Sequence, residues 1–172
     1  MGTGFRTLPD LAVRTLGGSV VWATDESFAE RQNLILARPP TFDADSFGHR
    51  GKVYDGWETA RRRDAGNDWV SVQLAGEGRV RLADLDTSYF LYNAPGWATL
   101  RGRGSGDWAE LLPRTRLQPD TRHRFLLADA PPAIEVRLDI YPDGGLARLR
   151  LFGELTDTGR RDVRLGWSAA AP

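Results

Sequence analysis

The chain has 172 residues, with 23 Lys plus Arg against 23 Asp plus Glu, two His and no Cys. Balanced charge provides no net field to recruit nucleic acid or an acidic membrane, and the absence of Cys excludes a disulfide framework, a thiolate nucleophile and a Cys-ligated zinc ion. This length suits a single domain, residues 1–172, that buries one core without disulfides or metals.

The first segment, residues 1–6, lacks the apolar core of a signal peptide. No apolar run approaches the roughly 20 residues needed to cross a bilayer. We therefore expect a soluble, cytoplasmic protein that binds neither membranes nor nucleic acid.

The first half of the chain predicts strands separated by loops. Residues 19–23, Ser-Val-Val-Trp-Ala, are β-branched and aromatic and predict a strand. Residues 27–40 predict a covering loop with at most one helical turn, and residues 42–63 a long loop over one end of the fold. Apolar alternation predicts one strand at 68–74 and, after a turn at the glycines of 76–78, another at 80–85.

The second half continues this pattern, with strands predicted at 97–101, 122–127 and 135–141. The turn residues Pro-Asp-Gly-Gly at 142–145 predict that 146–153 returns as the hairpin partner of 135–141. We expect a tail from residue 156 onward that contains at most one helical turn, and no long amphipathic helix anywhere in the chain. About eight short strands between Gly and Pro turns favour an all-β, antiparallel sandwich.

The densest group of chemically useful side chains lies at residues 47–63. It contains His49, the only lysine of the chain, and Asp55 and Glu58 three residues apart. Arginine offers a planar fork of donors that matches a carboxylate, whereas Asp and Glu accept from N–H groups. His49 is a candidate proton carrier because imidazole titrates near neutral pH. The stretch therefore predicts a site for a small polar anion.

Structural roles are the alternative for the same residues. Trp57 and Tyr54 could be core aromatics, and the three arginines at 61–63 a solvated run of charge. Asp55 could cap the turn at the following glycine, and Glu58 lies four residues from an arginine, the spacing of a helical surface pair. We predict no cofactor and no metal site, because the two His show no ligand spacing, although a divalent ion held by carboxylates alone stays open.

Several long blocks of the chain resemble one protein family. They are LPDLA at 8–12, LGGSVV at 16–21, FGHRGKVYDGWETARRR at 47–63, DW at 68–69, DLDTS at 84–88 and LDIYPDGGLARLR at 138–150. In this order they resemble the repeat unit of allantoicase, a hydrolase of ureide catabolism. The resemblance implies a jelly-roll fold like that of galactose-binding domains. It also implies hydrolysis of a small-molecule ureide substrate, allantoate, to ureidoglycolate and urea.

Roles for individual residues follow from matching the family's motifs. We expect catalytic residues among His49, Asp55 and Glu58, with His49 first for proton transfer and either carboxylate able to bind ureido N–H groups. An arginine would hold the substrate carboxylate. The expected substrate-binding positions are Arg50, Lys52, Trp57, Arg61, Arg62, Asp86, Thr87 and Asn93.

Two departures from the family pattern keep other functions open. The family resembles a tandem of two such units and this chain supplies one, so we expect a homo-oligomer in which two copies pair. After Ser88 the family tends to show a histidine, and a glycine beside the asparagine, where this chain has Tyr89 and Tyr92. The alternatives are therefore a catalytically inactive ligand-binding module, or a partner subunit of another allantoicase-like chain.

Overall fold

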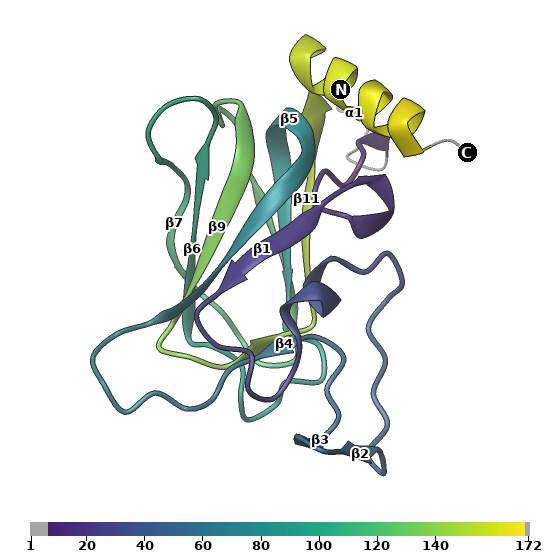
Figure 1. The fold of residues 1–172 in the computed structure, drawn as a ribbon. Helices are drawn as coiled ribbons and strands as arrows, with labels where there is room; N and C mark the ends of the chain where they lie inside the picture. The colour runs from purple at the N-terminus through teal and green to yellow at the C-terminus, as the bar shows by residue number, and fades with distance from the viewer. Residues whose placement is uncertain (1–6, 171–172) are drawn as a thin grey trace.

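Antiparallel strands dominate the structure, a computed structural model that describes residues 7–170 (Figure 1). Residues 1–6, for which the sequence predicts no signal peptide, lie outside the described part, as do residues 171–172. The main sheet consists of β1 (Ser19–Ala23), β5 (Asp68–Asp86), β6 (Trp97–Arg103), β7 (Ala109–Arg116), β8 (Arg122–Leu126), β9 (Ala133–Tyr141) and β11 (Arg148–Leu155). The short pairs are β2 (Phe47–Gly48) with β3 (Gly51–Lys52), and β4 (Trp57–Glu58) with β10 (Gly145–Leu146). The helical segments are η2 (Arg14–Leu16), η3 (Arg31–Ile35) and α1 (Asp157–Ala170).

The long strand β5 belongs to both layers of the fold. Its first half pairs with β1 on one side and β9 on the other, and β6 and β7 extend that layer. Its second half pairs with β8 and β11, which form the other layer. The predicted antiparallel sandwich is therefore confirmed, with all pairings of the main sheet antiparallel.

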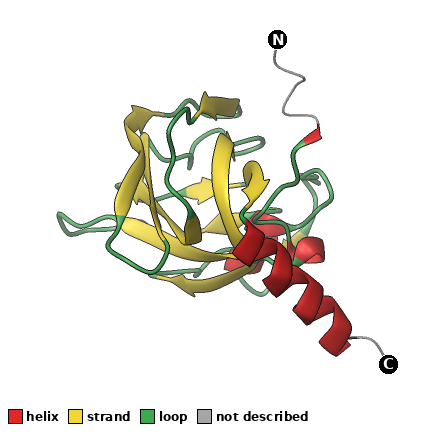
Figure 2. Ribbon diagram, turned by 90° about the horizontal axis from the view of Figure 1, so that it is seen from above, coloured by secondary structure: helices red, strands yellow, loops and turns green. Residues whose placement is uncertain are grey.

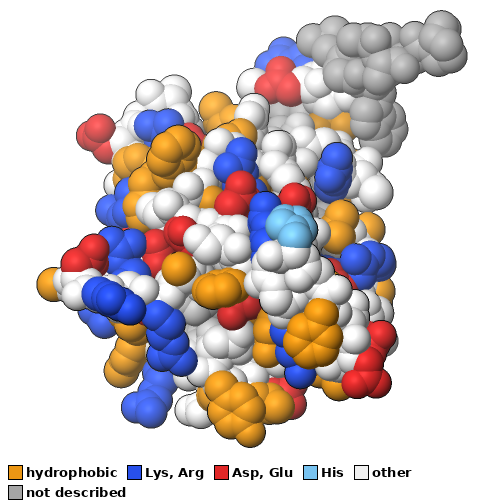
Figure 3. All heavy atoms as spheres, turned by 60° about the horizontal axis from the view of Figure 1, so that its bottom comes forward, with side chains coloured by type: hydrophobic (Ala, Val, Ile, Leu, Met, Phe, Trp, Pro, Cys, Tyr) orange, Lys and Arg blue, Asp and Glu red, His pale blue; other side chains and the backbone are white. Residues whose placement is uncertain are grey.

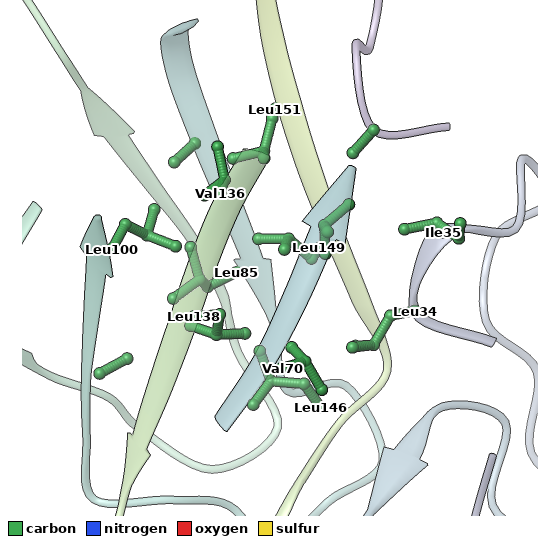
Figure 4. Close-up of a cluster of buried hydrophobic side chains, with 14 of the residues drawn as sticks. Leu34, Ile35, Val70, Leu85, Leu100, Val136, Leu138, Leu146, Leu149 and Leu151 are labelled. Atoms are coloured by element: carbon green, nitrogen blue, oxygen red, sulfur yellow. The ribbon is translucent and has the colours of Figure 1, made fainter. Parts of the chain in front are cut away.

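Side chains from the two layers meet in one apolar core (Figure 4). Leu100, Val136 and Leu138 enter it from the first layer, and Leu85 and Leu149 from the second. All five are fully buried. The alternation of apolar residues predicted for β9 is confirmed, because Val136, Leu138 and the following Ile140 all face this core.

The prediction of two strands separated by a turn at 76–78 is wrong, because β5 runs without a break from residue 68 to 86. The glycines are needed for close packing. A Cβ on Gly76 would lie 2.7 Å from the Gly159 carbonyl oxygen of α1, and a Cβ on Gly78 would lie 2.5 Å from the Leu11 side chain. The glycines therefore let β5 pass close to α1 and Leu11 without reversing its direction.

The predicted hairpin between 135–141 and 146–153 is also wrong. β9 pairs with β5 and β6, whereas β11 pairs with β5 in the other layer. Between them the chain crosses the end of the sandwich, where Gly145 of β10 pairs with Glu58 of β4. Gly144 has φ of 126°, and a Cβ there would lie 2.3 Å from the Asn93 carbonyl oxygen. Because its glycines pack against β4 and Asn93, the turn takes the chain from β9 in one layer to β11 in the other.

The C-terminal segment forms α1, a 14-residue helix, where the sequence predicted a tail. The Thr156 hydroxyl accepts a 3.1 Å hydrogen bond from the Gly159 amide, which caps the helix, and Asp157 lies in its first turn. Figure 2 shows α1 beside the strands at one corner of the sandwich. Within residues 7–170, no helix is both long and apolar enough to span a lipid bilayer.

The segment at 42–63 covers the opposite end of the sandwich from α1, as predicted, and carries β2, β3 and β4 (Figure 1). Gly56 fixes its approach, because a Cβ there would lie 2.2 Å from the Leu146 carbonyl oxygen. This close contact brings β4 against β10 and places its side chains at the end of the core.

Candidate active site

The two residues of β4 point in opposite directions because strand side chains alternate. Trp57 is fully buried, and its Nε1 donates a 2.7 Å hydrogen bond to the Asp25 carbonyl oxygen. Trp57 is thus a core aromatic, the structural alternative recognised in the sequence. Glu58 is held on its backbone by Ala29, whose amide donates to the Glu58 carbonyl oxygen at 3.2 Å. β4 therefore fixes Glu58 at the covered end of the sandwich.

The Glu58 side chain lies in a confined polar setting. It is only 8% exposed, and its Oε1 accepts a 2.6 Å hydrogen bond from Asn93 Nδ2. Burial raises the pKa of Glu58 above its ordinary value, against the opposing effects of the Asn93 hydrogen bond and the Arg61 charge. Burial and the neighbouring Glu58 charge also raise the pKa of the Tyr54 phenol. We call Tyr54, Glu58, Arg61 and Asn93 the Glu58 cluster.

Arg61 contributes an exposed guanidinium to this cluster. Its Nη2 donates a 3.1 Å hydrogen bond to the Tyr92 carbonyl oxygen, which ties it to the same turn as Asn93. An exposed guanidinium beside a mostly buried carboxyl provides an anion-binding fork next to an acid-base group.

A pocket of about 170 Å³ lies beside this cluster under the β2–β3 hairpin, and we call it the hairpin pocket. It contains three of the expected residues, His49, Arg50 and Lys52, at its rim. Arg50 donates from Nη1 to the Glu26 carbonyl oxygen at 3.0 Å, and the Lys52 ammonium lies 5.1 Å from the centre of the Phe42 ring. The full lining is Phe28, Ala29, Glu30, Asn33 and residues 48–54.

Aromatic rings connect the pocket to the Glu58 cluster. Tyr54 lines the pocket, and its ring centre lies 5.1 Å from that of Phe90 and 5.6 Å from that of Phe42. Phe42 in turn stacks on Tyr89 at 5.7 Å. Figure 3 shows basic, acidic and hydrophobic side chains interspersed over this end of the molecule.

Asp55 is engaged in a different network. Its carboxylate accepts hydrogen bonds from Arg38, from the Thr41 amide and from Arg148. Burial alone would raise the pKa of Asp55, but these hydrogen bonds and the Arg148 charge outweigh it and lower the pKa. The Asp55 carboxylate therefore holds the 42–63 loop through several partners, whereas the sequence suggested only that it caps the turn at Gly56.

The other expected residues lie in separate surroundings. Arg62 donates to Asp68 at 2.7 Å and to Asp64 at 2.9 Å. The buried Thr87 hydroxyl lies 2.6 Å from the Gln118 carbonyl oxygen and accepts from the Thr121 amide at 3.0 Å. Asp86 accepts from the Ser88 amide at 2.9 Å. The structure thus brings Glu58, Arg61 and Asn93 together and places His49, Arg50 and Lys52 at the neighbouring pocket. The side chains of Asp55, Arg62, Asp86 and Thr87 are hydrogen-bonded to groups outside the Glu58 cluster.

Two residues of the site region, Tyr54 and Arg148, were not among the site residues predicted from the sequence. Tyr54 lines the pocket, and the Glu58 charge raises the pKa of its phenol; its position in the middle of the 47–63 stretch was the available signal. Arg148 holds Asp55, and no local pattern indicates a partner 93 residues away. Within the described residues, no group of three or more His, Cys, Asp or Glu is arranged to hold a metal ion.

Comparisons with known proteins agree with the family resemblance. The family model described as "Allantoicase repeat" matches residues 9–156. A probable allantoicase of Nocardia farcinica is 66% identical over 148 residues, which are 85% of this chain and 42% of the relative. The crystal structure of Saccharomyces cerevisiae allantoicase superposes with a TM-score of 0.76 at 30% identity, covering 85% of this chain and 43% of that one. The chain thus spans less than half the length of these relatives.

A more distant group of structures identifies the architecture alone. A family 32 carbohydrate-binding module of C. perfringens, solved in complex with galactose, has a TM-score of 0.63 at 12% identity and matches 83% of this chain. The jelly-roll sandwich of the galactose-binding type, expected from the sequence, is confirmed.

Proposed function

Because the chain belongs to the allantoicase family, we propose that it hydrolyses allantoate to ureidoglycolate and urea, with Glu58 as the proton-transfer group. The observation that carries this proposal is the mostly buried Glu58 carboxyl, which has a raised pKa and lies beside an amide and an exposed guanidinium. The family relationship supplies the reaction, and the Glu58 cluster supplies groups suited to it.

The substrate requires three kinds of contact. Allantoate carries one carboxylate and two ureido groups on a central carbon. Hydrolysis breaks one bond from that carbon to a ureido nitrogen, forms a bond to a water oxygen, and moves a proton to the departing urea. Arg61 would pair with the carboxylate, and the Asn93 amide would face a ureido group.

Glu58 would act at both stages of proton transfer. In its neutral form, which burial favours, it protonates the nitrogen of the departing urea. In its ionised form, which Arg61 and Asn93 favour, it accepts the proton of the incoming water. A group whose pKa lies closer to the working pH exchanges protons more effectively, and such catalysis typically contributes about 10²- to 10⁴-fold.

The residues at the hairpin pocket would complete the substrate contacts. We propose His49 as a second proton carrier, and Arg50 and Lys52 as donors to the carbonyl oxygen of the second ureido group. Asp55 and Arg62 would support the loop, since their charges are already paired with Arg148 and Asp68.

The test is urea release from allantoate by the purified chain. We expect release by the wild type and a loss of at least about 100-fold in Glu58→Gln, which keeps shape and hydrogen-bonding capacity but cannot exchange the proton. Glu110→Gln, at an exposed position on β7, is the matched control and should retain activity. Full turnover in Glu58→Gln would overturn the assignment.

Two results with the wild type would favour the alternatives. Calorimetric binding of allantoate without urea release would indicate a ligand-binding module. Neither binding nor release would indicate a partner subunit that completes a site on another chain.

We also propose that two copies pair, because the chain spans less than half of its relatives. Sedimentation should then give twice the chain mass of 19.1 kDa. A monomer at all concentrations tested would exclude the pairing.

The cytoplasm is the proposed location, consistent with the absence of Cys.

A further inference from the structure

The outer side of the first layer carries a local excess of arginine. We call the outward-facing side chains of β6, β7 and β9 the arginine face. Its charged residues are Arg101, Arg103, Arg114, Arg116 and Arg137 against Glu110, Glu135 and Asp139. The whole chain has equal numbers of basic and acidic residues, so this excess belongs to the face. Among the described elements, no helix lies over this side of the sheet (Figure 1).

Arg114 and Arg116 keep the N–H donors of their guanidiniums free. In the described part of the chain these two guanidiniums contact rings alone. The Arg114 guanidinium carbon lies 4.2 Å from the centre of the Tyr141 ring and 5.7 Å from that of Trp97, and the Arg116 carbon lies 5.8 Å from the Trp97 centre. A ring contact positions a guanidinium and leaves its planar fork of donors for another partner.

The remaining arginines of the face are already paired. Arg137 donates to both carboxylate oxygens of Asp139 at 3.0 and 2.8 Å, and Arg101 donates to the same group at 3.3 Å. Arg103 donates twice to Glu135, at 2.9 and 2.7 Å. The uncompensated positive charge is therefore concentrated at Arg114 and Arg116, beside a Trp97 ring that is 39% exposed. Arg, Trp and Tyr are the residues most enriched at the energetic centres of protein interfaces.

A hollow of about 390 Å³ lies at the other end of the same face. The exposed side chains of Val21 and Ile134 give it an apolar wall, and the 104–106 loop lines its rim beside Arg103. Arg103 and Trp97 stand at the two ends of β6. At a rise of about 3.3 Å per residue, roughly 20 Å separates them, a distance that about seven residues of an extended chain can span.

We propose that the arginine face binds an extended acidic segment of a partner protein, whose carboxylates pair with Arg114 and Arg116 and whose apolar side chain enters the hollow. A carboxylate matches the donor fork of a guanidinium, and the spacing of the two regions suits an extended chain. The proposal uses no residue of the Glu58 cluster or the hairpin pocket, so it does not depend on the proposed catalysis.

Two other occupants fit the face less well. A second copy, paired through the same face, would bring like charges together at Arg114 and Arg116, and such contacts are unfavourable. Single-stranded nucleic acid binds by stacking its bases on open aromatic rings. Here guanidiniums already lie over the Trp97 and Tyr141 rings. Carboxylates need the guanidiniums and leave this stacking in place.

A blocked peptide of about ten residues, alternating glutamate with glycine and carrying leucine at both ends, is a suitable probe. Either direction of binding then places one leucine at the hollow. Fluorescence anisotropy of the labelled peptide should show saturable binding to the full chain. A peptide with glutamine in place of glutamate should bind at least about 10-fold more weakly. Equal binding of the two peptides, or no saturable binding of the acidic one, would overturn the proposal.

Variants test the two guanidiniums. The double variant Arg114→Ala/Arg116→Ala should weaken binding of the acidic peptide at least about 10-fold. Arg124→Ala, an exposed arginine of β8 in the other layer, is the matched control and should leave it within about twofold. Arg114→Glu/Arg116→Glu should instead bind a peptide with lysine in place of glutamate. Unchanged binding in the folded double Ala variant, or an equal loss in Arg124→Ala, would contradict the assignment.

Ile134→Ser tests the hollow. It should weaken binding of the leucine-ended peptide and leave a serine-ended peptide unaffected, because only the leucine contacts Ile134. Equal effects on both peptides would exclude this contact. Tighter binding of oligothymidylate than of the acidic peptide would identify the face as a nucleic-acid surface. Loss of self-association in Arg114→Ala/Arg116→Ala, measured by sedimentation, would identify it as an interface between copies. Either result would overturn the proposal.

Discussion

Arg148 donates from Nη2 to both carboxylate oxygens of Asp55, at 2.9 and 3.0 Å. The Arg148 side chain is 1% exposed, and its Nη1 also donates to the Asp55 carbonyl oxygen at 3.1 Å. One guanidinium thus joins the start of β11 to the loop that precedes β4. This attachment lies three residues before Glu58 in the chain.

Asp55→Ala should destabilise the protein by about 3 kcal/mol at neutral pH, because it leaves the buried Arg148 charge unpaired. The folded pKa of Asp55 is lowered, so its stabilising contribution is present above its ordinary pKa of 3.8 and is lost as pH falls through the folded value. Urea denaturation at pH 7 and at acidic pH measures the difference. A variant as stable as the wild type at pH 7 would show that the pair contributes little.

Glu58→Gln should be at least as stable as the wild type at pH 7 to 8, although we expect it to be inactive. The folded pKa of Glu58 is raised, so the native state favours the protonated carboxyl and loses stability as pH rises through that value. Gln removes this loss and still accepts from Asn93. The stability difference should disappear below pH of about 4, where Glu is protonated in both states. Thermal unfolding against pH tests this, and a variant much less stable at pH 8 would contradict it.

Asn93→Ala should raise the pKa of Glu58 further, because it removes a hydrogen bond that favours the ionised carboxylate. The pKa can be measured directly by ¹³C NMR of the Glu58 carboxyl, whether or not the chain is active. If turnover occurs, the acidic limb of the kcat/KM profile should move to higher pH. An unchanged or lowered Glu58 pKa would mean that the 2.6 Å contact does not act on its ionisation.

Gly56→Ala should destabilise the protein by about 2 kcal/mol, since the added methyl group would lie 2.2 Å from the Leu146 carbonyl oxygen. Gly106→Ala is the matched control, because a Cβ there meets nothing within 4 Å. The comparison requires only denaturation midpoints of the two variants. Equal midpoints would show that β4 and β10 can separate without cost.

Much of the sandwich followed from sequence because strand periodicity is local. Val136, Leu138 and Ile140 alternate with polar residues, and they face the core as predicted. Strand partners depend on distant residues instead. The glycines after β9 resemble a hairpin turn. In the structure they pack against Asn93 and pair with Glu58, so the chain crosses the end of the sandwich instead of turning back. The helix α1 was missed because its capping threonine precedes a segment with two glycines, which lower helix propensity.

The candidate site was predictable as a stretch but not residue by residue. Asp55 and Glu58 have similar chemistry and lie three positions apart, so sequence alone treats them alike. The fold gives Asp55 the guanidinium of Arg148 and gives Glu58 the amide of Asn93 in a mostly buried setting. Both partners come from other parts of the chain. Burial raises the pKa of Glu58 against the Asn93 hydrogen bond, whereas the hydrogen bonds and charge of its partners outweigh burial and lower the pKa of Asp55.

The shared strand β5 also determines how the molecule can come apart. Since it supplies hydrogen-bonded edges to β1 and β9 at one end and to β8 and β11 at the other, neither layer can peel away while leaving a complete neighbour behind. Loss of one layer removes hydrogen-bond partners of the other, so we expect the two layers to unfold together.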